Sequence, residues 1–499
     1  MELSVIYSRA MAGMLAPLVR VETHLSNGLP AFHIVGMPET AVRESKDRVR
    51  SALLNSYFEF PDRRITINLS PADLPKEGGR FDLPIALGIL AASNQLPPTL
   101  LHQHEFLGEL ALDGSLRAVP GVIPAAIAAT AEKRCLVVPA ASAHLAAHTP
   151  GCKIIAAQDL LALCAHLNGS ASIEPTPCVT KTIEYHYPDL DSVLGQPLAR
   201  RALEITASGG HNLLLFGPPG TGKTMLASRL PGILPPANAE DALIGLALRS
   251  YYDHAECDNW FKRPFRSPHH NATSAALIGG GGKPRPGEVS LAHGGVLFLD
   301  ELPEFSRSAL EVLREPLETG EVTISRANHK IGYPARFQLV AAMNPCPCGY
   351  EGDPEHHCRC TNSQVQRYRQ RISGPLLDRI DLTVAMSRIP AGDLLNKAKG
   401  AENSSTVRQR VVQANRLQIE RQGCSNAQLS GAALDQFCSL GSTERLFLEN
   451  AMEHLKLSAR ALHRTLRVAR TIADLAAVAT LNNEHIGEAL GYRNPQLKQ

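Results

Sequence analysis

The first third of the chain alternates short strand-like runs with longer apolar runs. Residues 65–69 (ITINL) alternate apolar and polar positions, which is typical of a strand with one buried face. The mostly apolar stretches 83–94 and 122–132 are long enough for buried helices, and residues 136–139 (LVVP) predict a further strand. We therefore expect an α/β domain in this block, which we place at residues 1–167.

The middle of the chain contains three runs that are almost wholly apolar and that each lead into polar or glycine residues. These runs are residues 212–216, 296–299 and 337–343. Such a pattern is typical of strands buried on both faces, as in a parallel sheet, where ligands gather at the carboxyl ends of the strands. We place this α/β domain at residues 184–388, after a Ser-, Thr- and Pro-containing linker at 168–183.

The last block, residues 389–499, is predicted to be mostly helical. Its two long periodic stretches are residues 406–421 and 458–481. Their many Arg and Lys side chains are expected first on solvated helix faces and only second as ligand contacts.

Composition limits the function classes only loosely. At about 150 residues per domain, 499 residues suggest about three domains. The formal net charge of +2 is close to neutral, so any basic surface for nucleic acid has to be local. The start of the chain lacks the basic and long apolar regions of a signal peptide, and no apolar run approaches about 18 residues. We expect a cytoplasmic protein with reduced thiols and no membrane span.

Residues 217–224 (GPPGTGKT) match the phosphate-loop pattern G-x-x-x-x-G-K-[ST] between a predicted strand and a predicted helix. Glycines let the backbone curl its N–H groups toward phosphate oxygens. The lysine can reach the terminal phosphates of ATP, and the hydroxyl of the last residue can bind Mg²⁺. The expected ATP-binding residues are Gly217, Pro218, Pro219, Gly220, Thr221, Gly222, Lys223 and Thr224.

Three polar side chains follow the other apolar strands and complete the predicted site. Asp300 and Glu301 end the run 296–299, where Asp300 can hold Mg²⁺ and Glu301 can polarise the attacking water. Asn344 ends the run 337–343 and can orient that water. The alternatives are a strand that simply ends in a polar loop and an Asn-Pro turn.

The interval between Thr224 and Asp300 is long for one strand–helix–strand passage, so an insertion is predicted. Within it, residues 278–287 (IGGGGKPRPG) combine glycines, prolines and two cations. Lys283 and Arg285 are candidate contacts to DNA phosphates. An ordinary surface loop explains the same residues equally well.

Four cysteines form a C-x-C…C-x-C arrangement: Cys346, Cys348, Cys358 and Cys360. Thiolates at this spacing fit a tetrahedral Zn²⁺ that pins the loop after Asn344. His356 and His357 are possible substitute ligands. Two disulfides are the alternative, which a reducing compartment disfavours.

These motifs, together with residues 263–270 (RPFRSPHH), 286–293 (PGEVSLAH) and 374–381 (GPLLDRID), resemble the magnesium-chelatase-like branch of the AAA+ ATPases. Over the whole chain the sequence resembles the ComM/YifB family. The resemblance implies a homo-oligomeric, usually hexameric ring that binds ATP and Mg²⁺ between subunits. It assigns Arg379 as an arginine finger and Arg460 as a second sensor; ordinary salt bridges are the alternative for both.

The same resemblance implies a DNA motor. A ring of this type would act on single-stranded and branched DNA as a helicase or branch-migration enzyme, in natural transformation and homologous recombination. The alternatives are a chelatase-type motor that remodels a protein during metal insertion and a DNA-binding factor with regulatory ATPase activity.

Residues 76–84 and 107–114 resemble the Lon protease fold. That family uses a serine activated by a lysine, whereas this chain has Arg80 and Ala125 at those positions. We therefore expect no peptide hydrolysis. Arg80, Arg63 and Arg64 are candidate surface cations.

Overall fold

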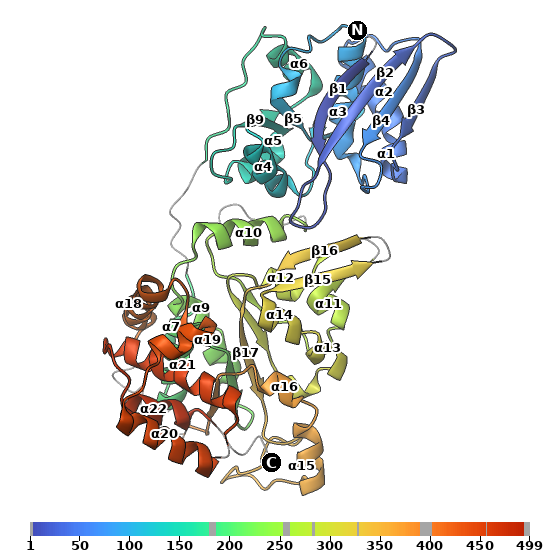
Figure 1. Cartoon of the computed structure of the whole chain (residues 1–499). Helices are drawn as coiled ribbons and strands as arrows, with labels where there is room; N and C mark the ends of the chain where they lie inside the picture. Colours follow the sequence, from blue (N-terminus) through green and yellow to red (C-terminus); the bar gives the residue numbers. More distant parts are fainter. Residues whose placement is uncertain are drawn as a thin grey trace. The chain divides into compact units, whose positions relative to one another are not determined.

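The computed structural model describes residues 3–178, 186–252, 260–281, 285–326, 329–389, 402–455 and 457–493. The chain divides into two compact units (Figure 1). The first consists of residues 1–183 and 243–260, and the second of residues 184–242 and 261–499. No helix in the described ranges is long and apolar enough to cross a bilayer.

A seven-stranded mixed sheet forms the centre of the first unit, in the order β3-β4-β2-β1-β5-β8-β9. The predicted strand at 65–69 lies within β4, where Ile65, Ile67 and Leu69 are buried and alternate with partly exposed residues. The strands are β1 (Leu3–Arg9), β2 (Leu18–Ser26), β3 (Ala31–Val35), β4 (Arg64–Ser70), β5 (His104–Phe106), β8 (Cys135–Pro139) and β9 (Ile154–Ala157), with a separate pair, β6 (Glu109–Leu110) and β7 (Leu116–Arg117).

The helices of the first unit confirm the predicted buried stretches. Every residue of α3 is buried against the sheet, and the helix ends at Ala92, two residues before the predicted end. Asn94 has a φ of 61°, which an α-helix does not allow. The other helices are α1 (Thr40–Arg43), α2 (Ser45–Asn55), α3 (Asp82–Ala92), α4 (Val122–Ala131), α5 (Ala140–Ala146) and α6 (Leu160–Leu167).

Residues 243–260 belong to the first unit although they interrupt the sequence of the second. The buried Tyr251 hydroxyl donates a hydrogen bond to the carbonyl of Gly13. The Trp260 ring packs edge-on against His148, with ring centroids 5.0 Å apart. The first unit is therefore completed by a segment that follows the phosphate loop in the sequence.

A five-stranded sheet in the order β11-β14-β17-β10-β18 forms the core of the second unit, and all its pairings are parallel. The three predicted apolar strands are confirmed as its central members, and their side chains are almost fully buried. The strands are β10 (Leu213–Phe216), β11 (Phe265–Arg266), β14 (Val296–Leu299), β17 (Gln338–Met343) and β18 (Leu382–Ala385). Because the strands are parallel, the residues that follow them meet at one edge of the sheet.

The predicted insertion between the phosphate loop and β14 contains a short hairpin, in which β12 pairs antiparallel with β13. Gly279 has no room for a side chain, since an added Cβ would collide with the Arg285 carbonyl and lie 3.0 Å from the Cδ1 of Ile324. This hairpin therefore lies against a second one. The elements between the phosphate loop and β14 are α9 (Leu230–Ile233), α10 (Ala239–Arg249), α11 (Ser274–Ile278), β12 (Gly279–Gly280), β13 (Arg285–Pro286) and α12 (Glu288–Leu291). The second hairpin follows β14 and consists of β15 (Glu321–Arg326) and β16 (His329–Pro334).

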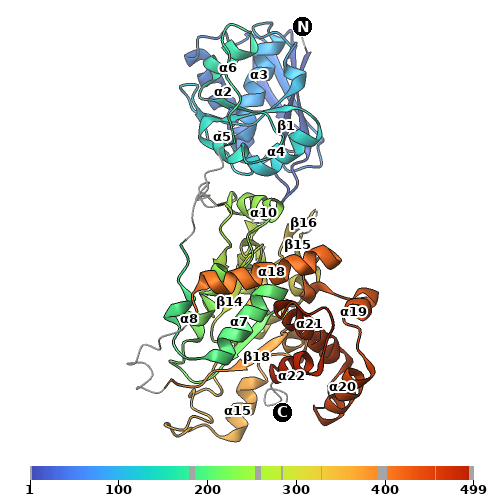
Figure 2. The same cartoon turned by 90° about the vertical axis from the view of Figure 1, so that its left-hand side faces the viewer.

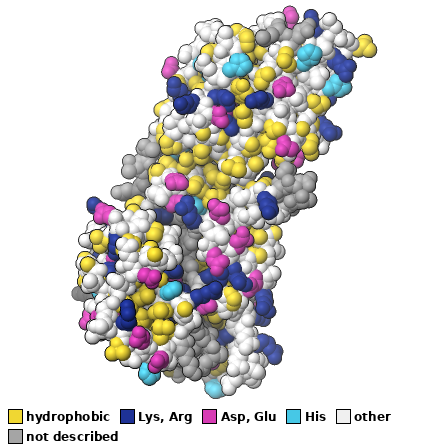
Figure 3. All heavy atoms as spheres, viewed as in Figure 1, with side chains coloured by type: hydrophobic (Ala, Val, Ile, Leu, Met, Phe, Trp, Pro, Cys, Tyr) yellow, Lys and Arg dark blue, Asp and Glu magenta, His cyan; other side chains and the backbone are white. Residues whose placement is uncertain are grey.

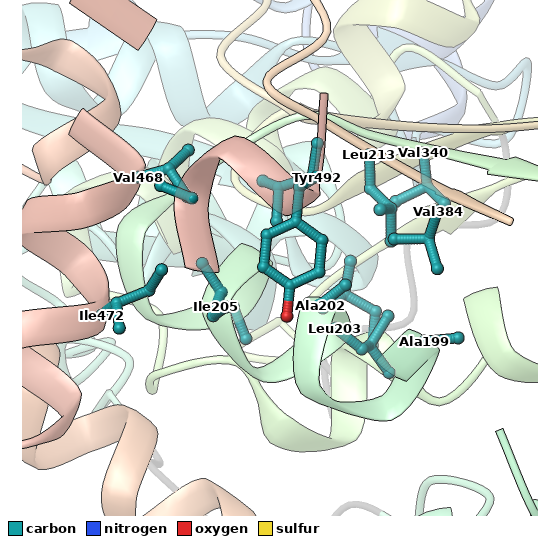
Figure 4. Packing of buried hydrophobic residues seen from close by; sticks show 14 of the residues in the cluster. Ala199, Ala202, Leu203, Ile205, Leu213, Val340, Val384, Val468, Ile472 and Tyr492 are labelled. Atoms are coloured by element: carbon teal, nitrogen blue, oxygen red, sulfur yellow. The ribbon is translucent and has the colours of Figure 1, made fainter. Parts of the chain in front are cut away.

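The C-terminal helices gather beside α7 (Figures 1 and 2). Figure 4 shows Val468, Ile472 and Tyr492 near Ala202, Leu203 and Ile205 of α7, in one apolar cluster. The predicted helix 458–481 is shorter than expected: it ends at Leu475, and Ala477 has a φ of 56°. These helices are α7 (Pro197–Gly209), α18 (Ser404–Gln422), α19 (Gly431–Phe437), α20 (Ser442–Leu455), α21 (Ala459–Leu475) and α22 (Asn483–Gly491).

The described part of the second unit also contains several short α-helices. They are α8 (Lys223–Ala227), α13 (Arg307–Glu311), α14 (Arg314–Thr319), α15 (Asn362–Arg369) and α16 (Gly374–Leu377). Acidic and basic side chains are interspersed over the face of the molecule shown in Figure 3, in keeping with a formal net charge of only +2.

Candidate nucleotide site

The phosphate loop requires glycine at three of its positions for two different reasons. Gly220 and Gly222 have φ values of 80° and 86°, in the left-handed region that other residues rarely adopt. An added Cβ at either position would meet open space, so the loop backbone there is accessible to a ligand. At Gly217 an added Cβ would instead collide with the carbonyl oxygen of Met386.

Lys223 is the buried cation of this loop. Its Nζ donates hydrogen bonds to the carbonyls of Gly217 (2.6 Å) and Pro218 (2.8 Å) and to Oδ1 of Asn344 (3.1 Å). Burial lowers the pKa of Lys223 to about 8, although the charges of Asp300 and Glu301 act in the opposite direction. The structure thus brings Asn344 within hydrogen-bonding distance of the predicted phosphate-binding lysine.

The carboxyl end of β14 meets the other side of the loop. The Thr224 hydroxyl donates to Oδ2 of Asp300 at 2.6 Å, and the backbone N–H of Glu301 donates to Oδ1 of Asp300 at 2.9 Å. Glu301 itself is exposed, with a φ of 53°. The predicted Mg²⁺ ligands are therefore already adjacent, and the side chain of the predicted water-polarising residue is accessible.

His270 is a member of this site that the sequence reasoning did not single out. Its Nδ1 lies 3.2 Å from Oε2 of Glu301, and its ring packs at a tilt of 36° against that of His269, with centroids 4.1 Å apart. The histidines follow β11, which is the parallel neighbour of β14. Only the order of the strands in the sheet places His270 beside Glu301, because polar residues that follow neighbouring parallel strands come together.

The two arginines expected from the resemblance lie elsewhere in the second unit. Arg379 follows α16, forms an ion pair with Glu318 and donates from Nη1 to the Pro375 carbonyl at 2.6 Å. Arg460 is exposed in the first turn of α21. Among the described residues, no hydrogen bond or ion pair joins either arginine to the phosphate loop.

The four cysteines converge in the loop between β17 and α15. Their sulfur atoms lie within 4.8 Å of one another, with Cys346 3.3 Å from Cys348 and 3.6 Å from Cys358. All four are free thiols, and Cys346 is fully buried. His356 and His357 are not part of this group; His356 stacks on Tyr350 with centroids 4.8 Å apart.

This cysteine loop also contacts the phosphate loop. Gly349 lies so near Pro219 that an added Cβ would be 2.8 Å from the Cδ of Pro219 and 4.0 Å from the Cγ of Asn344. Any group that orders the four thiols therefore acts next to the nucleotide site.

The structure describes one of the two residues that are predicted to contact DNA. Lys283 lies outside the described residues. Arg285 is exposed on β13, opposite Gly280. Arg285 is thus on the surface of the insertion, as a contact to a polymer requires.

In the first unit, Arg80 is not a surface cation. Its side chain is buried and donates to the carbonyl of Arg9 at 3.3 Å and to that of Pro120. Burial lowers the pKa of Arg80 to about 10. Ala125 is also fully buried, on α4, whereas Arg63 and Arg64 are exposed. A buried guanidinium that is bonded to carbonyls offers no nucleophile for peptide hydrolysis.

The residues at the sheet edge fit ATP and Mg²⁺. The Lys223 ammonium donates hydrogen bonds to two backbone carbonyls, which attract a cation less strongly than charged phosphate oxygens do. The backbone at Gly220 and Gly222 is open to a ligand. The Thr224 hydroxyl and the Asp300 carboxylate are hard oxygen ligands of the kind that Mg²⁺ prefers.

Comparisons with known proteins match nearly the whole chain. Three family models match: "Magnesium chelatase, subunit ChlI" at residues 189–394, "Subunit ChlI of Mg-chelatase" at residues 21–142, and "Magnesium chelatase, subunit ChlI C-terminal" at residues 401–493. The competence protein ComM of Haemophilus influenzae is 51% identical over 99% of this chain and 98% of its own length. YifB of Escherichia coli is 50% identical over 99% of this chain and 97% of its own length. Lon protease 2 of Bacillus subtilis is 26% identical over 34% of this chain.

The lowered pKa of Lys223 predicts a pH-dependent affinity for nucleotide. Phosphate oxygens favour the charged ammonium, so binding above pH 8 requires proton uptake and weakens as the pH rises through about 8. We expect the Kd of a Mg²⁺-bound, non-hydrolysable ATP analogue, measured by titration calorimetry, to rise about 10-fold between pH 7.5 and 9.5.

The Lys223→Arg variant is the control, because its guanidinium stays charged over this range. Its affinity is expected to change by less than about 2-fold over the same interval. An equal pH dependence in the two proteins would contradict the assignment to Lys223.

Proposed function

The chain belongs to the ComM/YifB family of magnesium-chelatase-like AAA+ ATPases, and from this premise we propose that it is an ATP-driven ring motor that moves along DNA. Its architecture is that of the family: a Lon-protease-like α/β domain, a phosphate-loop ATPase core with a parallel sheet, and a C-terminal helical lid. The proposed domains are residues 1–167, 184–388 and 389–499, joined by the linker 168–183.

The observation that carries the ATPase assignment is the meeting of four side chains at the sheet edge: Lys223, Thr224, Asp300 and Asn344. Lys223 would bind the β- and γ-phosphates, and Glu301 would polarise the attacking water, which Asn344 would orient. Mg²⁺, held by Thr224 and Asp300, would neutralise charge on the transferred phosphoryl group. Glu301 contacts His270 in this structure, and loss of that contact would leave its carboxylate fully available to the attacking water.

The site is completed by a neighbouring subunit in this proposal. Arg379 would act as an arginine finger in the adjacent site, and Arg460 would sense the nucleotide from the lid. Support comes from the separation of Arg379 from its own phosphate loop, since its guanidinium is held by Glu318 and the Pro375 carbonyl. A closed ring of six subunits, the usual number in AAA+ motors, would supply every site with a finger.

The DNA assignment rests on the full-length similarity to a competence protein and on the exposed Arg285 in the hairpin of the insertion. Lys283 and Arg285 would contact phosphates of single-stranded or branched DNA without regard to sequence. Hydrolysis would then drive branch migration during the integration of incoming DNA, and during homologous recombination, in the cytoplasm.

We further propose that the four cysteines hold a structural Zn²⁺. Tetrahedral coordination with Zn–S bonds of about 2.3 Å places sulfur atoms about 3.8 Å apart, close to the spacing of these thiols. The ion would brace the loop that follows Asn344 and that packs on Pro219.

A second candidate function is favoured by the three family models, all of which describe a magnesium-chelatase subunit. A chelatase-type motor would remodel a protein partner and would have no need to bind DNA. Binding of single-stranded DNA at low salt separates the two candidates, because phosphate contacts strengthen as salt falls. A DNA-binding factor whose ATPase activity is only regulatory would bind DNA but displace no strand.

Glu301→Gln is the decisive variant for the motor. We expect it to bind ATP normally, to lose about 10²-fold or more of the DNA-stimulated ATPase rate, and to lose strand displacement on forked and three-stranded DNA. The matched control is Glu315→Gln, which changes an exposed glutamate on α14 and should leave the three activities unchanged. Strand displacement that survives in Glu301→Gln would contradict the motor.

The metal proposal predicts about one zinc per chain in protein purified without chelator, measured by atomic emission. Cys348→Ser should reduce the zinc content to near zero. Cys178→Ser, which changes an exposed cysteine outside the cluster, should retain it. Protein of the natural sequence that contains no zinc would refute the site.

A further inference from the structure

One buried arginine bonds the lid helix α21 to the segment that carries Arg379. The Nη2 of Arg464 lies 3.0 Å from Oδ1 of Asp378, and its Nη1 donates to the carbonyls of Ile380 (2.9 Å) and Leu377 (3.2 Å). Only 6% of the Arg464 side chain is exposed. The acceptors lie on both sides of Arg379 in the sequence.

The opposite side of this segment is bonded to the residue that precedes β10. The Asn212 side chain donates to the Arg379 carbonyl at 2.8 Å, and its backbone N–H donates to Oδ2 of Asp381 at 3.1 Å. Strand β10 leads directly into the phosphate loop. Residues 378–381 are thus held between the nucleotide-binding core and the lid.

The burial of Arg464 makes its attachment strong. A buried guanidinium that loses its acceptors leaves unpaired donors away from water, which is strongly unfavourable. A movement of α21 that broke these hydrogen bonds would cost free energy, so residues 377–380 are expected to move with the helix. These hydrogen bonds therefore couple the position of residues 377–380 to that of α21 more strongly than an exposed ion pair would.

Arg464 also lies one helical turn from Arg460 on α21. Residues four apart occupy the same face of a helix, and Nε of Arg464 lies 3.4 Å from the backbone carbonyl of Arg460. A shift of the first turns of α21 consequently displaces both arginines together.

We propose that Arg464 is a positioning residue that sets Arg379 for the neighbouring subunit's site and ties it to the lid. When nucleotide draws Arg460 and the start of α21, Arg464 carries the movement to residues 377–380. The nucleotide state of one subunit thereby adjusts the finger offered to the next. This inference rests on the proposed ring and on the roles proposed there for Arg379 and Arg460.

Mixed rings test the inference with separate donor and acceptor subunits. Glu301→Gln chains bind ATP but cannot hydrolyse it and can still donate Arg379, whereas Arg379→Ala chains bind ATP but lack the finger. An equimolar mixture should recover ATPase activity at interfaces that join the two. Arg464→Ala is then added to one partner at a time, with Arg416→Ala, at an exposed ion pair on α18, as the control.

We expect an asymmetric result. Arg464→Ala in the donor should reduce the recovered rate about 10- to 100-fold, as a misplaced catalytic group does. The same change in the acceptor should alter the rate by less than about 2-fold. Asp378→Asn in the donor should reproduce the loss in milder form, and Arg416→Ala should have no effect in either partner.

The remaining outcomes overturn the inference in distinguishable ways. Equal losses in the two partners would mean that Arg464 supports folding or its own subunit's site, because the acceptor lacks the finger. No loss in either partner would mean that Arg379 does not depend on Arg464. If the parent mixture recovers no activity, the shared site of the proposed function is itself wrong, and the inference falls with it.

Discussion

The nucleotide site depends on one buried positive charge. Lys223 is held below a glycine turn, bonded to two loop carbonyls and to Asn344, in surroundings that depress its pKa. A buried ammonium is stable only where acceptors surround it, and the parallel sheet supplies them by bringing the ends of β10, β14 and β17 to one edge. The cysteine loop packs against this edge, where Gly349 lies next to Pro219 of the phosphate loop.

Local patterns predicted the parts of this architecture that local chemistry determines. The phosphate loop and the three apolar strands were found because their residues are adjacent in the sequence, and the parallel sheet followed from strands without polar positions. The periodicity predicts too late an end for α21, since the apolar pattern continues past Ala477, whose backbone is left-handed. Periodicity reports which face of a helix is buried, and it does not report where the backbone turns.

The residues that the sequence did not reveal act through tertiary neighbours. His270 reaches Glu301 only because β11 lies beside β14, and Arg464 is remote in sequence from the acceptors that bury it. Arg80 was expected on the surface, because nothing local announces the carbonyls of Arg9 and Pro120 that accept its hydrogen bonds. In each case the partner, and not the residue type, decides the environment.

The ion pair between Arg379 and Glu318 has a consequence for how such a subunit behaves alone. A guanidinium that already has a carboxylate partner has no electrostatic reason to leave it for an empty neighbouring pocket. Only a stronger anion, such as the terminal phosphate of a bound nucleotide, can compete for it. In the proposed ring, Glu318 would therefore hold the Arg379 guanidinium until the neighbouring site binds nucleotide. Arg379 would then add little to the affinity between subunits while that site is empty.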